Sequence, residues 1–236
     1  MKFTLNVDHV ATLRNARGEQ QPDPVTFALM AEQFGVDGIV VHLREDRRHV
    51  SERDVRLLRE LLTTKLDLEM AAVDEIIEIA LDVQPELVTL VPEKRQELTT
   101  EGGLNVIDNI EKLKKTIIKM HEREILVSLF IEPDLEQIDA ALGIDADMIE
   151  IHTGNYANAE TEVKMFIELD RIKLAVEHAK RLGLGVNAGH GLNYNNIKDF
   201  LEVEGIDEVS IGQAVIARSV FVGLEKAITE MRSLIK

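Results

Sequence analysis

The fold is decided by one stretch, GIVVHLREDRRHVSERDVRLLRELL, at residues 38–62. Its first five residues, Gly38–His42, form a short β-branched run that ends in a polar side chain, which is typical of a buried strand. Ser51 is followed three residues later by Asp54, and this spacing predicts a capping box that opens a helix reaching about residue 62. The stretch is therefore a unit of one strand, one polar loop and one helix.

The same unit recurs along the whole chain. Further strands are expected at residues 3–7, 66–70, 87–91, 125–131, 148–152, 185–188 and 208–211. Further helices are expected at residues 24–34, 74–83, 112–122, 134–142, 162–181, 197–201 and 215–234. About eight such units with short apolar strands predict a parallel barrel, because both faces of its strands are buried.

We therefore expect a TIM-type (β/α)8 barrel with additional short helices, folded as a single catalytic domain over residues 1–236. The length agrees, since such barrels occupy roughly 200–250 residues as one domain. An open doubly wound sheet is the alternative architecture, but its first strand would be followed by a glycine-rich turn. Here the first expected strand is followed by Asp8 and His9.

The composition excludes several classes of protein and site. The chain carries 43 Asp and Glu against 27 Lys and Arg, a formal net charge of −16. That balance disfavours contact with nucleic acid or anionic lipid, so an anionic ligand must be met by a local basic cluster. The absence of Cys excludes disulfides, thiolate metal sites and Cys nucleophiles. No signal-peptide run and no stretch of about 18 apolar residues is present, and we expect a cytoplasmic protein.

Polar residues and glycines gather where the expected strands end. They are Asn6, Asp8, His9, His42, Arg44, Glu69, Glu150, His152, Asn187, Gly189, His190, Gly191, Gly212 and Gln213. In a parallel barrel the carboxyl ends of all strands meet at one rim, where active sites lie. Histidines and buried carboxyl groups on one rim suit proton transfer near neutral pH. The alternative is that Glu69 and Glu150 only close polar layers of the barrel.

Two regions of this rim predict anion binding. Residues 42–49 place three arginines in an acidic protein, and Arg44, closest to the strand end, is the best ligand for a phosphate. Arg47 and Arg48 fit a solvated charge run paired with the neighbouring acids, while Arg14 and Arg17 could reach the rim from the first loop. The glycines after the seventh and eighth strands fit a second phosphate site built from backbone N–H groups. Two phosphorylated substrates, or one bisphosphate, are expected.

The loop at residues 92–103 is longer than a barrel turn requires and contains a Gly102-Gly103 hinge. Such loops often serve as lids that exclude water. Thr99 and Thr100 could then donate hydrogen bonds to a phosphate. A surface loop without this role is the alternative.

Seven long blocks sharpen this interpretation, at residues 6–9, 11–17, 42–49, 91–97, 99–103, 150–154 and 186–191. In these blocks, and over essentially the whole length, the chain closely resembles the pyridoxine 5′-phosphate synthases. The resemblance implies condensation of 1-deoxy-D-xylulose 5-phosphate with 3-amino-2-oxopropyl phosphate to pyridoxine 5′-phosphate, phosphate and water, in vitamin B6 biosynthesis. It also implies that no metal or organic cofactor is needed and that the protein is a homo-octamer.

Matching motifs also imply roles for residues. His42 resembles a general base, Glu69 a second base, His190 the proton donor, and Glu150 a group that stabilises charge in the transition state. The deoxyxylulose phosphate would be held by Asp8, His9, Arg44, His49 and Thr99. The aminoketone phosphate would be held by Asn6, Arg17, Gly191, Gly212 and Gln213. Most relatives are expected to carry His after this last glycine; Gln213 can donate a hydrogen bond but carries no charge, so its backbone amide is the safer ligand.

Two other functions remain as hypotheses. A metal-dependent barrel hydrolase or aldolase could gather Asp8, His9, His42, Glu69 and His190 around a divalent ion, although no His-x-His or His-Glu-x-x-His motif is present. A sugar-phosphate sensor would need the phosphate ligands but not Glu69 or His42. Metal analysis separates the first from a metal-free synthase, and turnover separates the second.

Overall fold

The structure, a computed structural model, describes residues 1–93 and 102–235. Within these residues eight parallel strands form one closed barrel in chain order, with β8 paired to β1. The strands are β1 (Lys2–Asn6), β2 (Gly38–His42), β3 (Lys65–Met70), β4 (Leu87–Leu90), β5 (Leu126–Ile131), β6 (Met148–His152), β7 (Gly185–Gly189) and β8 (Glu208–Ile211). The predicted TIM-type barrel is therefore confirmed.

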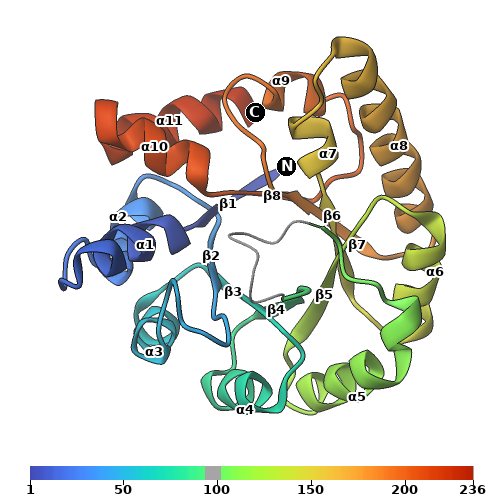
Figure 1. The fold of residues 1–236 in the computed structure, drawn as a ribbon, viewed down its shortest axis with the longest axis horizontal. Helices are drawn as coiled ribbons and strands as arrows, with labels where there is room; N and C mark the ends of the chain where they lie inside the picture. The colour runs from blue at the N-terminus through green and yellow to red at the C-terminus, as the bar shows by residue number, and fades with distance from the viewer. Residues whose placement is uncertain (94–101, 236) are drawn as a thin grey trace.

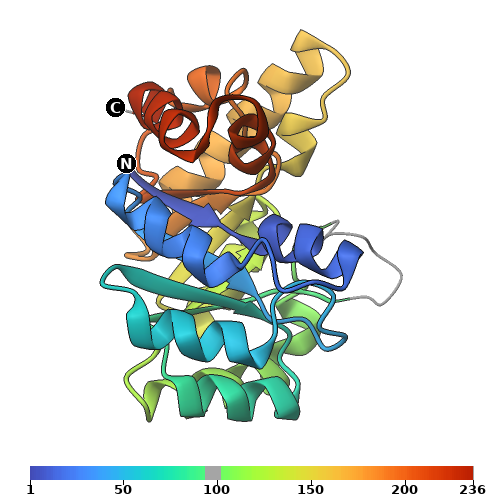
Figure 2. The ribbon, with the colours of Figure 1, turned by 90° about the vertical axis from the view of Figure 1, so that its left-hand side faces the viewer.

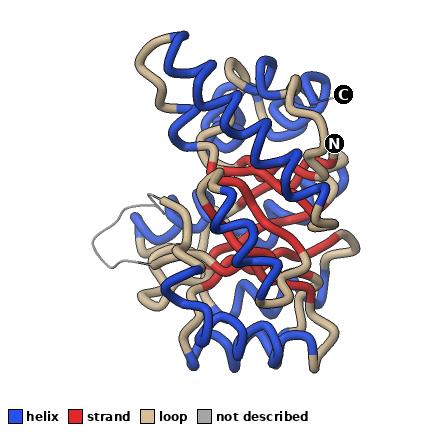
Figure 3. Tube along the Cα trace, turned by 90° about the vertical axis from the view of Figure 1, so that its right-hand side faces the viewer, coloured by secondary structure: helices blue, strands red, loops and turns tan. Residues whose placement is uncertain are grey.

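Helices surround the barrel, so the strands lie inside and the helices outside (Figures 1 and 3). They are α1 (Asp8–Arg17), α2 (Pro24–Gln33), α3 (Glu52–Leu61), α4 (Asp74–Val83), α5 (Ile110–His121), α6 (Leu135–Gly143), α7 (Gly154–Ala157), α8 (Glu162–Arg181), α9 (Ile197–Phe200), α10 (Gln213–Val222) and α11 (Leu224–Ile235), with a 3-10 turn η1 (Ile107–Asn109) before α5. The two termini lie close together (Figure 2). Among the described residues no helix is both long and apolar enough to cross a membrane.

The two faces of the strands differ in chemistry. Alternate residues such as Leu66, Leu68 and Val88 are fully buried in the hydrophobic core between strands and helices. Many of the other alternate residues, which face the barrel interior, are polar, such as Thr4, Asp67 and Glu150. Lys65 Nζ of β3 lies 2.7 Å from Glu208 Oε1 of β8, a contact between strands that are not neighbours and that must cross the interior. A polar interior leaves the barrel centre available for ionisable groups.

Two helical expectations were wrong. The first loop contains a helix, α1, that begins at Asp8 without a side-chain cap on its preceding residue. Its start is held instead by tertiary contacts, because the Asp8 carboxylate accepts the His42 backbone N–H at 3.0 Å. The single helix expected at 215–234 is two helices, α10 and α11, separated at Gly223, where φ is +83°. Glycine adopts that backbone conformation without the steric cost that other residues meet.

Candidate active site

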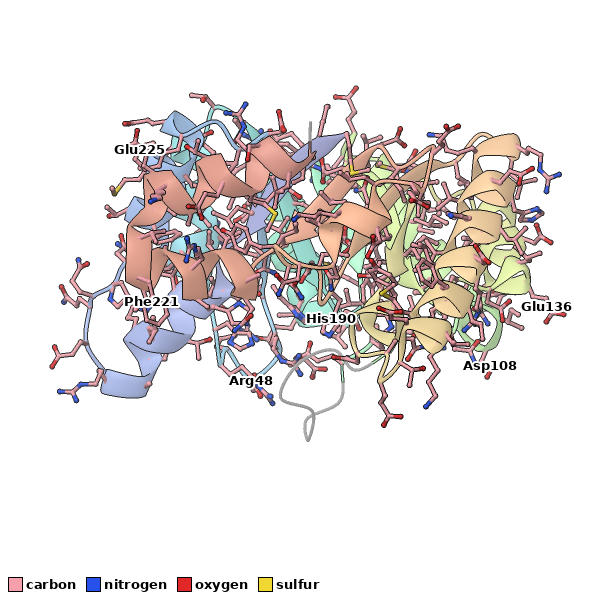
Figure 4. All side chains as sticks on the ribbon, turned by 90° about the horizontal axis from the view of Figure 1, so that it is seen from above. Arg48, Asp108, Glu136, His190, Phe221 and Glu225 are labelled. Carbon is pink, nitrogen blue, oxygen red and sulfur yellow. The ribbon has the colours of Figure 1, made fainter. Side chains whose placement is uncertain are left out.

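A cavity of about 340 Å³ lies at the carboxyl ends of the strands. It is lined by twelve of the fourteen residues predicted to form the site: Asn6, Asp8, His9, His42, Arg44, His49, Glu69, Glu150, His190, Gly191, Gly212 and Gln213. Figure 4 places the labelled His190 and Arg48 on the same side of the molecule, which is the side of this rim. The structure thus brings together side chains that are more than 200 residues apart in the sequence.

The two remaining predicted residues are placed differently. Arg17 does not line the cavity but lies at the C-terminal end of α1, beside Gly18. Thr99 lies outside the described residues, as do Thr100 and most of the expected lid. Of the other arginines, Arg14 pairs with Asp54 at 2.8 Å, so its charge serves the start of α3 and not the rim.

Arg47 and Arg48, expected in a charge run with Glu45 and Asp46, are both paired with acids, but the carboxylate partners of Arg47 are different ones. Arg48 pairs with Asp46 at 2.6 Å. Arg47 pairs with Glu52 at 2.7 Å and also with Glu75. Neither lines the cavity, which leaves Arg44 as the arginine of this segment that does.

His42 and Glu69 are paired across β2 and β3 by the strand register. The His42 Nδ1 atom lies 3.9 Å from Glu69 Oε2, close in space but beyond hydrogen-bond distance. The His42 backbone N–H is fixed by both carboxyl oxygens of Asp8, at 3.0 and 3.2 Å. Asn6 in turn fixes Asp8, accepting its backbone N–H at 2.9 Å. Residues of β1, β2 and α1 therefore fix the backbone of His42, which carries the imidazole.

The carboxyl groups of the site hold protons more tightly than carboxyl groups in water. Burial raises the pKa of Glu69 well above its usual value, and the negative charges of Glu150 and Asp8 add to this effect. Burial, together with Asp67 and Glu208, raises the pKa of Glu150 to about 8. Burial also raises the pKa of Asp8 to about 7, against the opposing hydrogen bond from the His42 backbone. Carboxyl groups with pKa values raised in this way can donate protons at neutral pH.

The imidazoles are shifted in the other direction. Burial, reinforced by the positive charge of Arg44, lowers the pKa of His42 to about 3. Burial, with the neighbouring His9, lowers the pKa of His49 to about 4. Burial and the neighbouring His152 lower the pKa of His190 to about 4. Neutral imidazoles beside protonated carboxyl groups give the site proton acceptors and proton donors at the same pH.

Arg44 is the cationic group most deeply placed at the rim, with only 1% of its side chain exposed. Its Nε lies 3.3 Å from Glu93 Oε1, and Glu93 Oε2 lies 3.9 Å from His42 Nε2. His49 completes this side of the cavity, with Nδ1 3.0 Å from the Thr12 hydroxyl. A buried guanidinium with two imidazoles nearby is suited to an anionic group.

The opposite side of the cavity is formed by backbone. Gly212 precedes the first turn of α10, and its Cα approaches Asn6 so closely that an added Cβ would lie 2.9 Å from the Asn6 carbonyl oxygen. Gln213 is exposed and begins the helix. Gly191 after β7 has φ +88°, a conformation that favours glycine. Backbone N–H groups at a ten-residue helix N-terminus, beside a glycine turn, fit a second anion.

Several side chains in or beside the cavity were not predicted from the sequence, among them Glu93, Phe130 and Asn193. Glu93 contacts both His42 and Arg44, although its segment was considered only as part of a lid. Phe130 and Asn193 also line the cavity. Phe130 follows the inward alternation of β5 and could have been found from the strand period, whereas nothing in the local sequence marks Glu93. Among the described residues, no three His, Asp or Glu side chains are arranged so that they could hold a metal ion.

Comparison with known proteins places the chain in a family. A family model described as "Pyridoxal phosphate biosynthesis protein PdxJ" matches residues 3–236. The chain is 56% identical to the pyridoxine 5′-phosphate synthase of Chlorobium phaeobacteroides over 236 residues, the full length of both. It is 53% identical to that of Geobacter sulfurreducens, covering 100% of this chain and 98% of the relative. The chain belongs to the pyridoxine 5′-phosphate synthase family.

Membership of the pyridoxine 5′-phosphate synthase family makes the chain an enzyme of pyridoxine biosynthesis. More distant solved structures agree on the fold alone. A thiamine phosphate pyrophosphorylase from Pyrococcus furiosus superposes with a TM-score of 0.66 at 18% identity, over 99% of this chain and 95% of that one. The KGPDC structure from Streptococcus mutans superposes with a TM-score of 0.64 at 13% identity, over 100% and 99% of the two chains.

Proposed function

We propose that the enzyme condenses 1-deoxy-D-xylulose 5-phosphate with 3-amino-2-oxopropyl phosphate to give pyridoxine 5′-phosphate, phosphate and water. The observation that supports this proposal is one cavity with Arg44 and His49 on one side, glycines and a helix N-terminus on another, and ionisable groups between them. Arg44 and His49 lie on one side, and Gly191 and the start of α10 on the other. Two phosphorylated substrates bound with their phosphates apart would meet over His42 and Glu69.

The first phosphate side is assigned to the deoxyxylulose phosphate, held by Asp8, His9, Arg44 and His49, together with Thr99 from outside the described residues. The Arg44 guanidinium supplies buried positive charge at this rim of an acidic protein. Burial raises the pKa of Asp8 to about 7, and in its protonated form Asp8 can donate a hydrogen bond to a sugar hydroxyl. Binding here leaves the carbonyl end of the sugar toward the barrel centre.

The second side is assigned to the aminoketone phosphate, held by Asn6, Gly191, Gly212 and Gln213, with Arg17 closing from the end of α1. On this side a phosphate can approach the backbone closely, because residue 212 is a glycine. A Cβ at this position would collide with Asn6. The dipole of α10 favours negative charge at its first residues. The Gln213 side chain is not required for this contact, since its backbone N–H is at the helix N-terminus.

The reaction needs several proton transfers, since a Schiff base forms between the amine and a ketone, water and phosphate leave, and the ring closes. Neutral His42 accepts a proton directly. Glu69, whose pKa burial raises well above its usual value, first gives a proton to an oxygen that leaves as water and then, as a carboxylate, acts as the second base. Glu69 can act first as an acid and then as a base because its pKa is raised.

His190 and Glu150 act at the other side of the reacting atoms. His190 is neutral in the empty site, and two phosphate dianions raise its proton affinity when the substrates bind, which prepares it as the proton donor. Glu150 stabilises the charge that develops as the ring closes. A Cβ at Gly189 would lie 2.1 Å from Glu150 Oε1, so glycine at this position leaves the space that Glu150 occupies.

We further infer a cytoplasmic homo-octamer that needs no metal or organic cofactor. Large apolar side chains exposed on α8 and α10 support association: Val163, Phe166, Ile167, Leu174, Val220 and Phe221, the last 83% exposed. Apolar patches of this kind usually mark protein–protein contacts. Phe221, labelled in Figure 4, lies on the periphery, away from His190.

The test is incubation of the chelator-treated protein with both substrates, with each substrate alone, and with neither, followed by mass spectrometry of the product. Pyridoxine 5′-phosphate only in the complete mixture is the expected result. Product that appears only after a divalent ion is added would favour the metal-dependent enzyme. Saturable substrate binding with no product from folded protein would favour the sensor.

A further inference from the structure

His152 is a buried histidine that the proposed mechanism does not use. It ends β6 but does not line the cavity. Its ring packs against two rings that do, with centroid distances of 5.2 Å to Phe130 and 5.0 Å to His190. The interplanar angle with His190 is 60°, a tilted contact that fixes how the two rings face each other. His152 therefore forms the wall behind the proton donor.

Glu132, just after β5, holds His152 from behind. Its Oε1 atom lies 2.6 Å from His152 Nδ1 and also accepts the Gly103 backbone N–H at 2.9 Å. The side chain of Asn155 donates to the other oxygen at 3.4 Å. In the tautomer that donates from Nδ1 to the Glu132 carboxylate, Nε2 is an acceptor.

His152 Nε2 is buried and has no hydrogen-bond partner among the described residues. It lies beside Gly154 at the start of α7: a Cβ at Gly154 would lie 2.4 Å from His152 Nε2 and 3.3 Å from His190 Cδ2. Only a residue without a side chain allows the two imidazoles to approach here. The geometry leaves a polar atom beside the donor that a purely structural ring would not require.

The backbone of His190 is held by the same segment. Its φ is +76°, a strained backbone conformation that residues other than glycine rarely adopt. The Thr153 hydroxyl donates to the Gly189 and His190 carbonyl oxygens at 2.9 and 2.6 Å. Residues 152–154 thus fix both the backbone and the ring of His190, and such strain persists where the surroundings over-determine it.

We infer that Glu132 and His152 are positioning residues that act as one unit to set the ring orientation and the proton affinity of His190. The inference rests on the proposed role of His190 as proton donor. Three groups on three elements face this ring: His152 from β6, His9 from α1, and Glu132 after β5. Burial and the two histidines lower the pKa of His190, whereas the negative charge of Glu132 raises it.

The first variant is Glu132→Gln, which keeps an acceptor oxygen and removes the charge. We expect kcat to fall about 10- to 100-fold, by analogy with the loss of partners that orient metal-ligating histidines, with both KM values within about twofold. Removal of the negative charge lowers the pKa of His190, so the alkaline limb of the kcat–pH profile moves to lower pH. A matched control is Asp139→Asn, which alters an equally short 2.6 Å pair with His178 between α6 and α8 and should leave kcat and the profile unchanged.

The second variant, His152→Phe, keeps a ring between Phe130 and His190 but removes both nitrogens. If Glu132 acts through His152, Glu132→Gln causes no further loss of kcat in the His152→Phe background. The inference would be overturned if the losses of kcat in the two single variants multiplied in the double variant. It would also be overturned if either single variant, correctly folded, kept the wild-type kcat and pH profile.

A readout without turnover separates this inference from the proposed function. NMR titration of labelled histidine reports the pKa of His190 in the substrate-free protein, and we expect it to be lower in Glu132→Gln and unchanged in Asp139→Asn. An unchanged His190 pKa in Glu132→Gln contradicts the inference whether or not the enzyme makes pyridoxine 5′-phosphate. Lack of product from the wild-type protein, with the expected NMR shift, contradicts only the proposed function.

Discussion

His42 Nδ1 lies 3.9 Å from Glu69 Oε2, and on the other side of the same ring His42 Nε2 lies 3.9 Å from Glu93 Oε2. Both distances exceed that of a hydrogen bond, so carboxyl groups flank the ring without occupying its nitrogens. Because burial lowers the pKa of His42 and raises that of Glu69, the pair holds one neutral acceptor and one proton donor. A substrate between them could receive and lose protons without a change in net charge.

Glu69→Gln is expected to lower kcat by at least about 100-fold, as for loss of a proton-transfer group. The amide keeps the size of the side chain and removes a buried carboxyl group, so the midpoint of thermal unfolding should not decrease. Steady-state kinetics and thermal unfolding of the same preparation test this. Turnover unchanged in a folded variant would remove Glu69 from the mechanism.

Gly212→Ala is expected to raise the KM for the aminoketone phosphate, because the new Cβ would lie 2.9 Å from the Asn6 carbonyl oxygen and displace the phosphate side of the cavity. Gln213→Ala is the matched control on the next residue. If the Gln213 backbone N–H is the ligand, this variant changes the KM by less than about threefold, the range of a weak exposed contact. A large effect of Gln213→Ala with none from Gly212→Ala would assign binding to the side chain instead.

Arg44→Lys is expected to raise the KM for the deoxyxylulose phosphate about tenfold or more, since an ammonium cannot reproduce the guanidinium fork at a buried site. The KM for the aminoketone phosphate should change little. Arg48→Lys is the control, on an arginine of the same segment that does not line the cavity and is 24% exposed. If both variants changed both KM values equally, the positive charge at the rim would attract the substrates in general, and Arg44 would not form a specific phosphate site.

The free energy of unfolding should fall between about pH 6.5 and 8. Asp8, Asp67 and Glu150 have pKa values raised to about 7, 7 and 8, so their contribution to stability is full below about pH 4 and is lost as pH rises through the folded values. The lowered pKa values of His42 and His190 act oppositely, but only below the unfolded value of 6.5. Above that pH the carboxyl groups alone remain, each contributing up to about 1.4 kcal/mol per pH unit.

Asp67→Asn removes one of these carboxyl groups. Asp67 accepts the Thr89 hydroxyl at 2.9 Å, and an amide oxygen can take over that role. Urea unfolding at pH 6.5 and pH 8 should therefore show a smaller decrease in stability for the variant than for the wild type. A decrease of the same size in both proteins would mean that Asp67 is ionised already at pH 6.5.

Much of the fold could be predicted from the sequence. In most units the spacing of the apolar residues and the turn or capping residues indicate the same helix or strand. The expected helices 74–83 and 162–181 and the strands 148–152 and 208–211 coincide with α4, α8, β6 and β8. Helix α1 could not be predicted, because its sequence, DHVATLRNAR, has little apolar character and its start depends on Asp8 contacting β2. The break at Gly223 could have been predicted, since glycine commonly ends helices.

The candidate site was predicted mainly through its rim position. Residues at strand ends, such as Asn6, Glu69 and Glu150, meet because all strands are parallel, so knowledge of the barrel was enough. Glu93 and Glu132 were missed because each lies in a loop after its strand and acquires a partner only in three dimensions. Their contacts with His42 and His152 span 51 and 20 positions of the chain, which no local pattern records.

The most direct test of the account follows inorganic phosphate and the pyridine chromophore together in one reaction of the chelator-treated enzyme with both substrates. The account predicts that phosphate and chromophore appear in equal amounts, that omission of either substrate abolishes both, and that Glu69→Gln slows both alike. Phosphate released without the chromophore, or from one substrate alone, would contradict a cavity in which two phosphorylated substrates meet over His42 and Glu69.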